Sequence, residues 1–277
     1  MKIQLVLNHT SYTADLSAAI PISIPLKFDG EQPNHFGVPP ATAEPVQAGD
    51  FLGDVRRGGS CNVESYRVIP HCNGTHTECV GHITEERVAI MEALRQPLVP
   101  ATLITVEPVR GEETPESYAP PKAAEDILIT RQALEAALAS AEPAFLTAVI
   151  IRTRPNDPGK RSRNYLQEPP PYFSREAMAY LGDLPLRHLL VDIPSVDRVF
   201  DEGRMVNHRR FWGMPSGSRR LADAARPDRT ITEMIYAPDE VADGRYLVNI
   251  QIPPFLADAA PARVWLFPIS PASSERK

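Results

Sequence analysis

The sequence predicts an α/β or α+β fold, a single domain over residues 1–277 with a mixed, strand-rich core and peripheral helices. Short runs rich in valine and isoleucine, bounded by proline, glycine or aspartate, outnumber the amphipathic segments. No repeat of 20–50 residues is visible, which argues against a solenoid or a propeller. The 29 prolines are about twice the usual ~5% share, and their clustering favours short strands joined by ordered loops.

The expected strands are short apolar runs. Those around Val149 and Leu190 are continuously apolar, as expected of central strands buried on both faces. Tyr246, Val248 and Ile250 alternate along the chain, which indicates a strand with one buried face. The expected strands cover residues 103–106, 148–153, 189–193, 230–236, 246–252 and 264–269.

Four segments are expected to be helical because a hydroxyl cap or an apolar stripe marks them. Thr84 is expected to cap a helix over residues 84–95, with Glu85 and Glu86 in its first turn. Thr130 is expected to cap a second helix that ends near residue 140, and Ser174 a third. A short helix is expected over residues 219–225.

Composition limits the kinds of partner and the cellular compartment that we expect for this protein. The net charge of −6 and the pI of about 5.7 argue against a nucleic-acid surface, which carries a basic excess. No run approaches the ~18 apolar residues of a membrane span, and residues 3–7 are too few for a signal-peptide core. Three cysteines cannot all pair within one chain. We therefore expect a soluble, cytoplasmic protein that binds neither nucleic acid nor membrane.

Residues 70–82 carry the strongest chemical signal. Three of the seven histidines, His71, His76 and His82, lie there together with Glu78. Imidazole and carboxylate suit zinc, manganese or iron. If residues 76–78 are extended, His76 and Glu78 point to one face of a strand. The competing interpretation is a polar loop without metal. A closed structural zinc site is disfavoured because Cys72 and Cys79 do not form a Cys-x-x-Cys pair.

The segment His71…Gly74-Thr75-His76-Thr77-Glu78…His82 resembles the His-x-Gly-Thr-His-x-Asp-x-Pro-x-His signature of the cyclase family, which contains bacterial kynurenine formamidase and isatin hydrolase. The resemblance extends along most of the chain. It includes Asp15-Leu16-Ser17, Ile151-Arg152-Thr153, the segment from Val191 to Asp197, Ile231-Thr232-Glu233 and Pro261-Ala262-Arg263.

The resemblance implies the cyclase-family (swivelling β/β/α-like) fold and a site with one or two divalent metals, zinc or manganese. By position, His71, His76 and Glu78 correspond to the first ligands, and His208 and Glu233 are the best candidates for the later ones. Glu233 has independent support, because on a strand it would share an apolar face with Ile231 and Ile235. His82 matches the histidine that handles protons, so His82 and Glu233 are the catalytic candidates.

Three departures from the family pattern bear on the substrate. Cys72 stands where the family has its first histidine, so either His71 or Cys72 is the ligand, and His71 is favoured. Glu78 replaces aspartate, which lengthens its reach. Cys79-Val80-Gly81 replaces the usual Ala-Pro-x. The separation of His208 from Glu233 suggests an insertion over the site at residues 211–227.

The expected reaction is the opening of an amide, formamide or cyclic amide, or of an ester or lactone, in a small carbonyl substrate by metal-activated water. Asp192 and Asp197 are candidates to orient ligands. The candidates to pack on a flat substrate ring are Phe36, Phe51, Phe211 and Trp212. A metal-containing binding protein without turnover and thiol chemistry at Cys72 or Cys79 are the competing hypotheses. A homo-oligomer, a dimer or tetramer, is expected.

Overall fold

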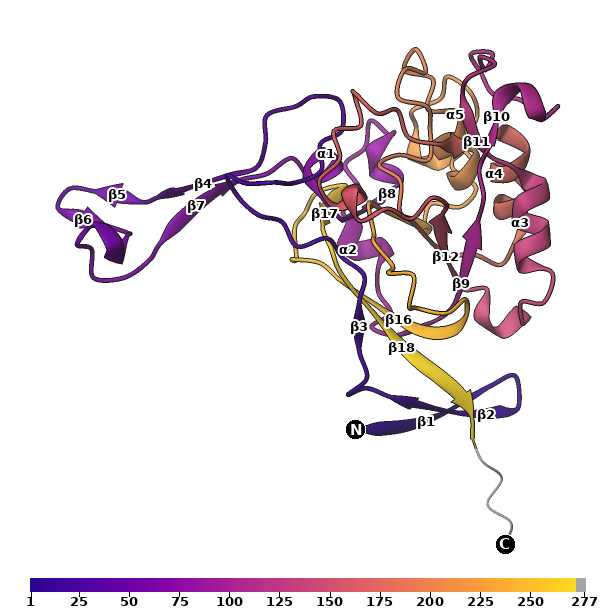
Figure 1. Cartoon of the computed structure of the whole chain (residues 1–277), viewed down its shortest axis with the longest axis horizontal. Helices are drawn as coiled ribbons and strands as arrows, with labels where there is room; N and C mark the ends of the chain where they lie inside the picture. The colour runs from indigo at the N-terminus through magenta and orange to yellow at the C-terminus, as the bar shows by residue number, and fades with distance from the viewer. Residues whose placement is uncertain (273–277) are drawn as a thin grey trace, which may run out of the picture.

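The structure, a computed structural model, describes residues 1–272 and is built on one large mixed sheet (Figure 1). Its central strand, β12 (Ala148–Thr153), pairs in parallel with β9 (Val99–Val106) and β14 (His188–Val191). Beyond β14, β15 (Thr230–Glu233) is parallel, and β8 (His76–Cys79) and β17 (Ala259–Pro261) follow in antiparallel pairing.

The other half of the sheet is antiparallel. β16 (Gly244–Gln251) pairs with β9, and β18 (Arg263–Pro271) pairs with β16. The hairpin of β1 (Lys2–Leu7) and β2 (Thr10–Asp15) extends this edge, and β3 (Ile20–Pro21) pairs with β18. The predicted mixed α/β class is therefore confirmed, although this N-terminal hairpin was not predicted.

The central strands are apolar throughout because neighbouring side chains enter two different cores. Val149 and Ile151 pack beneath the helices, whereas Ala148 and Ile150 pack on the opposite face. The covering helices are α3 (Arg131–Leu138), α4 (Arg175–Asp183) and α5 (Val206–Trp212). Figure 1 shows α3 and α4 running along one side of the sheet.

Two of the predicted helix starts are confirmed. The Thr130 hydroxyl accepts from the Ala133 backbone N–H at 3.2 Å, and the Ser174 hydroxyl from that of Ala177 at 2.9 Å. Both caps satisfy backbone donors that the first turn leaves free. The helices end at Leu138 and Asp183.

The predicted helix over residues 84–95 is wrong. Only α2 (Ile90–Ala93) is helical there, and the Thr84 hydroxyl donates to the Glu86 carbonyl instead of capping a helix. The Glu85 N–H donates to the Arg219 carbonyl at 2.8 Å, so a distant segment supplies the hydrogen bond that a helix would otherwise provide. At residues 219–225 only a 3-10 turn forms.

Strand ends also differ from the prediction. β14 stops at Val191, and β15 stops at Glu233 because Met234 takes a left-handed conformation with φ of 53°.

The remaining short helical elements are α1 (Pro70–Asn73) and the 3-10 turns Val55–Arg57, Val80–His82, Gly111–Glu113, Pro143–Phe145, Pro158–Arg161 and Leu221–Asp223. A small second sheet contains β10 (Val109–Arg110), β11 (Ile127–Ile129) and β13 (Tyr172–Phe173).

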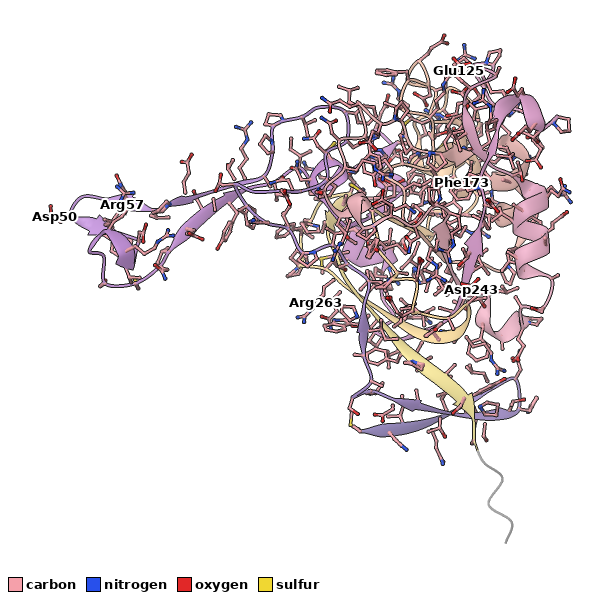
Figure 2. All side chains as sticks on the ribbon, in the orientation of Figure 1. Asp50, Arg57, Glu125, Phe173, Asp243 and Arg263 are labelled. Atoms are coloured by element: carbon pink, nitrogen blue, oxygen red, sulfur yellow. The ribbon has the colours of Figure 1, made fainter. Side chains whose placement is uncertain are left out.

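One hairpin projects from the body. It pairs β4 (Thr42–Pro45) with β7 (Glu64–Arg67) and, further out, β5 (Gln47–Ala48) with β6 (Phe51–Leu52). Figure 2 shows Asp50 and Arg57 near its far end, well away from Phe173 in the body. None of the helices within residues 1–272 is long and apolar enough to cross a membrane.

Candidate metal centre

The pairing of β8 with β15 brings the two halves of the predicted site together. His76 lies directly opposite Glu233, and Glu78 lies opposite Ile231. His76 and Glu78 alternate along the strand and therefore share a face. The His76 Nε2 atom lies 3.4 Å from Glu233 Oε2. Glu233 shares its face with Ile231, as predicted, but Ile235 follows the turn at Met234 and packs in the opposite core.

Helix α5 brings His208 to the same place. His208 Nε2 lies 3.0 Å from Glu78 Oε1, and His208 Nδ1 lies 2.6 Å from Asp197 Oδ2. Asp197 is itself fixed by the Tyr118 hydroxyl at 2.6 Å. The Nδ1–H group of His208 therefore donates to Asp197, and its Nε2 atom faces Glu78. Asp197 has the orienting role considered above, whereas Asp192 bonds Thr153 and Lys160.

His71, His82 and Asp258 form the outer part of the site. Asp258 Oδ2 lies 3.2 Å from His71 Nε2 and 3.6 Å from His82 Nδ1. The two imidazole rings stack with centroids 4.4 Å apart. Their side chains are about a quarter exposed, 27% and 26%, and that of Asp258 is 37% exposed. His76, Glu78, His208 and Glu233 are buried, so His71, His82 and Asp258 form the solvent-exposed side of the site.

These seven residues, here called the imidazole–carboxylate cluster, contain three sets of side chains whose ligand atoms lie within 4.8 Å of one another. The sets are His76, Glu78 and Glu233; Glu78, His82 and His208; and His71, His82 and Asp258. Glu78 belongs to two sets. If metal binds here, Glu78 would be a ligand common to two of the sets.

Glu78 is a buried carboxylate whose surroundings favour a positive partner, either a proton or a cation. It is fully buried, and neither of its oxygens accepts a hydrogen bond from residues 1–272. Burial opposes its ionisation, but the charges of His82 and His208 outweigh burial and lower the pKa of Glu78. Burial likewise opposes protonation of His208, yet Glu78 and Asp197 raise the pKa of His208 well above its usual value. The position between these two residues thus favours a proton or a metal ion.

The donor set itself fits a metal. The Nδ1 atom of His76 lies 3.0 Å from the Gly74 carbonyl, so this nitrogen carries the proton and Nε2 is left as a ligand atom. Nε2 of His76 is buried without a hydrogen-bond partner among residues 1–272, as are Nε2 of His71 and of His208. Buried polar atoms without partners are rare and costly, and each of these three atoms belongs to a residue of one of the three ligand sets, where a divalent cation would satisfy it.

The geometry separates His71 from Cys72. His71 Nε2 lies 3.4 Å from Glu78 Oε2, whereas Cys72 belongs to none of the three ligand sets. We expect His71→Ala to lose a large part of the bound metal and Cys72→Ala to keep it, as measured by elemental analysis of both purified variants. Metal loss in Cys72→Ala alone would make the thiol the ligand.

The thiols differ in access. Cys72 and Cys79 are buried, and burial raises their pKa values to about 11 and about 12, whereas Cys61 is exposed. Because the thiolate is the reactive form, we expect iodoacetamide at neutral pH to alkylate Cys61 alone in the folded protein. Peptide mass spectrometry would show the sites. Rapid modification of Cys72 or Cys79 would favour the thiol-chemistry hypothesis instead.

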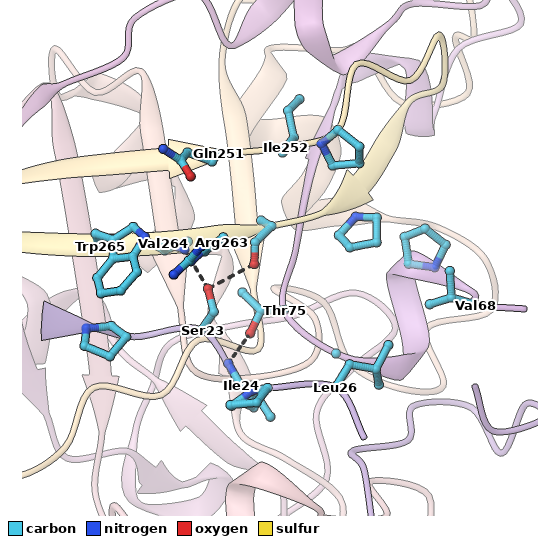
Figure 3. A pocket seen from close by; sticks show the side chains of 17 residues that line it. Ser23, Ile24, Leu26, Val68, Thr75, Gln251, Ile252, Arg263, Val264 and Trp265 are labelled. Carbon is cyan, nitrogen blue, oxygen red and sulfur yellow. Dashed lines mark hydrogen bonds between the residues drawn. The ribbon is translucent and has the colours of Figure 1, made fainter. Parts of the chain in front are cut away.

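A cavity of about 640 Å³ lies elsewhere and contains no member of the imidazole–carboxylate cluster. Figure 3 shows Trp265, Ile252 and Leu26 around it. Thr75 lines this cavity, where its hydroxyl accepts from the Ile24 N–H at 2.8 Å. Thr75 immediately precedes His76 in the sequence, so the cavity and the cluster share a segment of the chain. The cluster is exposed on another side, at His71, His82 and Asp258.

The exposure of the four aromatic residues predicted to pack on a substrate ring corrects part of that prediction. Phe211 and Trp212 are fully buried core residues beneath the helices, so they are not exposed platforms for a substrate ring. Phe36 is half exposed, and Phe51 lies on the projecting hairpin. The segment after α5 does pack beside the site, as its Arg219 carbonyl accepts from Glu85, three residues after His82.

Two residues of the site were not predicted. Asp258 follows an apolar loop and has no motif around it, so only the fold places it beside His71. His35 is buried with both ring nitrogens unpaired among the described residues, and its backbone N–H donates to the Cys72 carbonyl at 3.0 Å. Burial, with the nearby imidazoles of His76 and His208, lowers the pKa of His35 to about 4. Its histidine identity was the only available signal.

Comparisons with known proteins identify the family and the fold. The model of the cyclase family matches residues 14–198. The structure is similar to an isatin hydrolase bound to the product analogue thioisatinate, with a TM-score of 0.58 and 13% identity over 92% of each chain.

Two further solved structures have a TM-score of 0.57. One is a predicted metal-dependent hydrolase from Bacillus stearothermophilus, 18% identical over 90% of this chain and 97% of that one. The other is isatin hydrolase A from Labrenzia aggregata, 12% identical over 90% and 93%. No curated protein matches the sequence. The family match covers more than half of the chain, and these structures share its fold: the chain belongs to the cyclase family.

Proposed function

We propose that this protein is a metal-dependent hydrolase that opens a C–N bond other than a peptide bond, in a formamide or a cyclic amide, or an ester or lactone bond of a small carbonyl compound. The observation that carries the proposal is the buried Glu78 carboxylate, which faces His71, His82 and His208 and receives no hydrogen bond from residues 1–272. The isatin hydrolases of similar fold support the cyclic amide as a substrate class.

Each residue has a proposed role. His71, His76, Glu78, His208 and Glu233 hold zinc or manganese. The bound cation supplies polarisation of a carbonyl and of a water molecule, whose pKa falls towards ~7. Glu233 is fixed by the Val196 N–H, which donates to its Oε1 at 2.9 Å, and its Oε2 faces His76. Glu233 is thereby held to orient the attacking water.

His82 handles the proton. It lies on the exposed side of the site, with Nε2 3.8 Å from Glu78 Oε2 and Nδ1 3.6 Å from Asp258 Oδ2. Asp258 orients the ring so that Nε2 is free to take a proton from the nucleophile and return it to the leaving group. The neutral His35 offers one donor and one acceptor to the substrate.

The test combines metal analysis with a hydrolysis screen of isatin, aryl formamides and simple lactones. We expect turnover of at least one class, its loss after treatment with a chelator, and its return on adding zinc or manganese. A protein that holds stoichiometric metal but hydrolyses none of these classes would favour the competing hypothesis, a metal-containing binding protein. A homo-oligomer and a cytoplasmic location stay predictions.

A further inference from the structure

A second pocket, of about 520 Å³, lies beside α5 and the start of α4 and is lined by five arginines. They are Arg175, Arg204, Arg209, Arg210 and Arg219, and none of the other lining residues is acidic. The pocket contains no member of the imidazole–carboxylate cluster. It shares with that cluster only helix α5, which carries His208 to the metal centre and Arg209 and Arg210 to the pocket.

The protein neutralises the charge of this pocket only in part. Arg175, Arg210 and Arg219 form no ion pair within residues 1–272, and Arg204 pairs with Glu202 outside the lining. Other exposed arginines of the chain do pair, as Arg131 does with Glu135. In a chain of net charge −6, five arginines around one pocket, without an acidic residue in its lining, give that pocket a positive potential that attracts anions.

One of the five guanidinium groups is held in place before any ligand binds. Arg209 donates from Nε to the Arg204 carbonyl at 3.1 Å and from Nη1 to the carbonyls of Pro215 at 3.3 Å and Ser218 at 2.5 Å. Burial and the charge of Arg219 lower the pKa of Arg209. A fixed guanidinium loses little entropy on binding. Because Nε and Nη1 of Arg209 already donate to carbonyls, Arg209 can offer its Nη2 group to an anion, and bidentate contacts would have to come from the other arginines.

The pocket is larger than a single oxyanion needs. Its volume lies within the ~300–1,000 Å³ of small-molecule sites, and Ala119, Val206 and Met214 give it an apolar part. We propose that this pocket binds a small organic phosphate of about the size of a nucleoside monophosphate, with the phosphate on the arginines and its organic part against Val206 and Met214. The site goes beyond the proposed hydrolase function and does not depend on it.

The experiment is calorimetric titration of the metal-containing protein with three probes at constant ionic strength: pyrophosphate, adenosine monophosphate and adenosine. We expect the two phosphates to bind and adenosine not to bind. Arg210→Gln and Arg219→Gln should each weaken the binding of adenosine monophosphate at least about tenfold. Arg220→Gln is the matched control, because Arg220 is the next residue, is exposed and does not line the pocket.

A second control separates this pocket from the metal centre, since phosphates also bind divalent cations. Binding of adenosine monophosphate that persists in His76→Ala belongs to the arginine pocket. Three results would overturn the proposal: no binding of either phosphate at millimolar concentration, equal weakening in Arg219→Gln and Arg220→Gln, or loss of binding in His76→Ala. Binding of pyrophosphate without adenosine monophosphate would overturn the assigned ligand size.

Discussion

The His76→Ala variant is expected to lose its bound metal while its fold persists. His76 presents Nε2 to Glu233 and shares a strand face with Glu78, so its removal leaves both carboxylates without the imidazole that completes their ligand set. The affinity for the metal should fall by more than the ~10–100-fold that follows the loss of a residue that only hydrogen-bonds to a ligand. Glu78→Ala should behave alike, because Glu78 belongs to two ligand sets. Elemental analysis after gel filtration would measure the occupancy.

His188→Ala is the matched control. His188 is equally buried, with its Nδ1 2.8 Å from the Thr230 hydroxyl, but it belongs to no ligand set. It should lose thermal stability and keep its metal, which separates damage to the core from damage to the site. Full metal occupancy in His76→Ala would remove His76 from the centre and with it the assignment of β8 as the ligand strand.

His82→Ala is expected to keep metal and lose about 10²–10⁴-fold in turnover, the usual contribution of a positioned proton-transfer group. The physical reason is its contact with Asp258 and its place on the exposed side of the cluster. The measurement is kcat on whichever substrate the screen identifies, with metal content determined on the same sample.

The control for this variant is His9→Ala, an exposed histidine in the turn between β1 and β2. It should leave both turnover and metal unchanged. If His82→Ala loses metal, His82 is a ligand. Its membership of two ligand sets would be consistent with that result. If turnover is near normal, the proton passes elsewhere, and Asp258 is the next group to replace.

The sequence predicted those parts of the fold whose causes are local. Hydroxyl caps at Thr130 and Ser174 mark real helix starts, and the apolar run at residues 148–153 is β12. Thr84 looked equivalent to these caps, but its segment is held in another conformation by two hydrogen bonds: Glu85 N–H donates to the Arg219 carbonyl, and Leu221 N–H donates to the Glu86 carboxylate. That competition depends on a contact across more than a hundred residues and leaves no local pattern.

The same distinction applies to the site. His71, His76, Glu78 and His82 form one motif, and the resemblance to the family added His208 and Glu233. The structure brings all six together, while their roles stay predictions. Asp258 could not be predicted, because a single aspartate in a loop gives no periodicity or spacing to interpret. Helix α5 was missed because its polar run from Asn207 to Arg210 has no apolar stripe.

The register of His76 opposite Glu233 has a consequence for how this protein folds. The two residues are joined only after a chain closure of more than 150 residues, which is slow compared with local helix formation. In the unfolded chain, however, His71, His76, Glu78 and His82 remain neighbours along the sequence. If these residues are the ligands, we expect them to keep some affinity for metal before the sheet exists. Metal would then bind both states, and its stabilisation of the native state would be smaller than the affinity of the folded site alone would give.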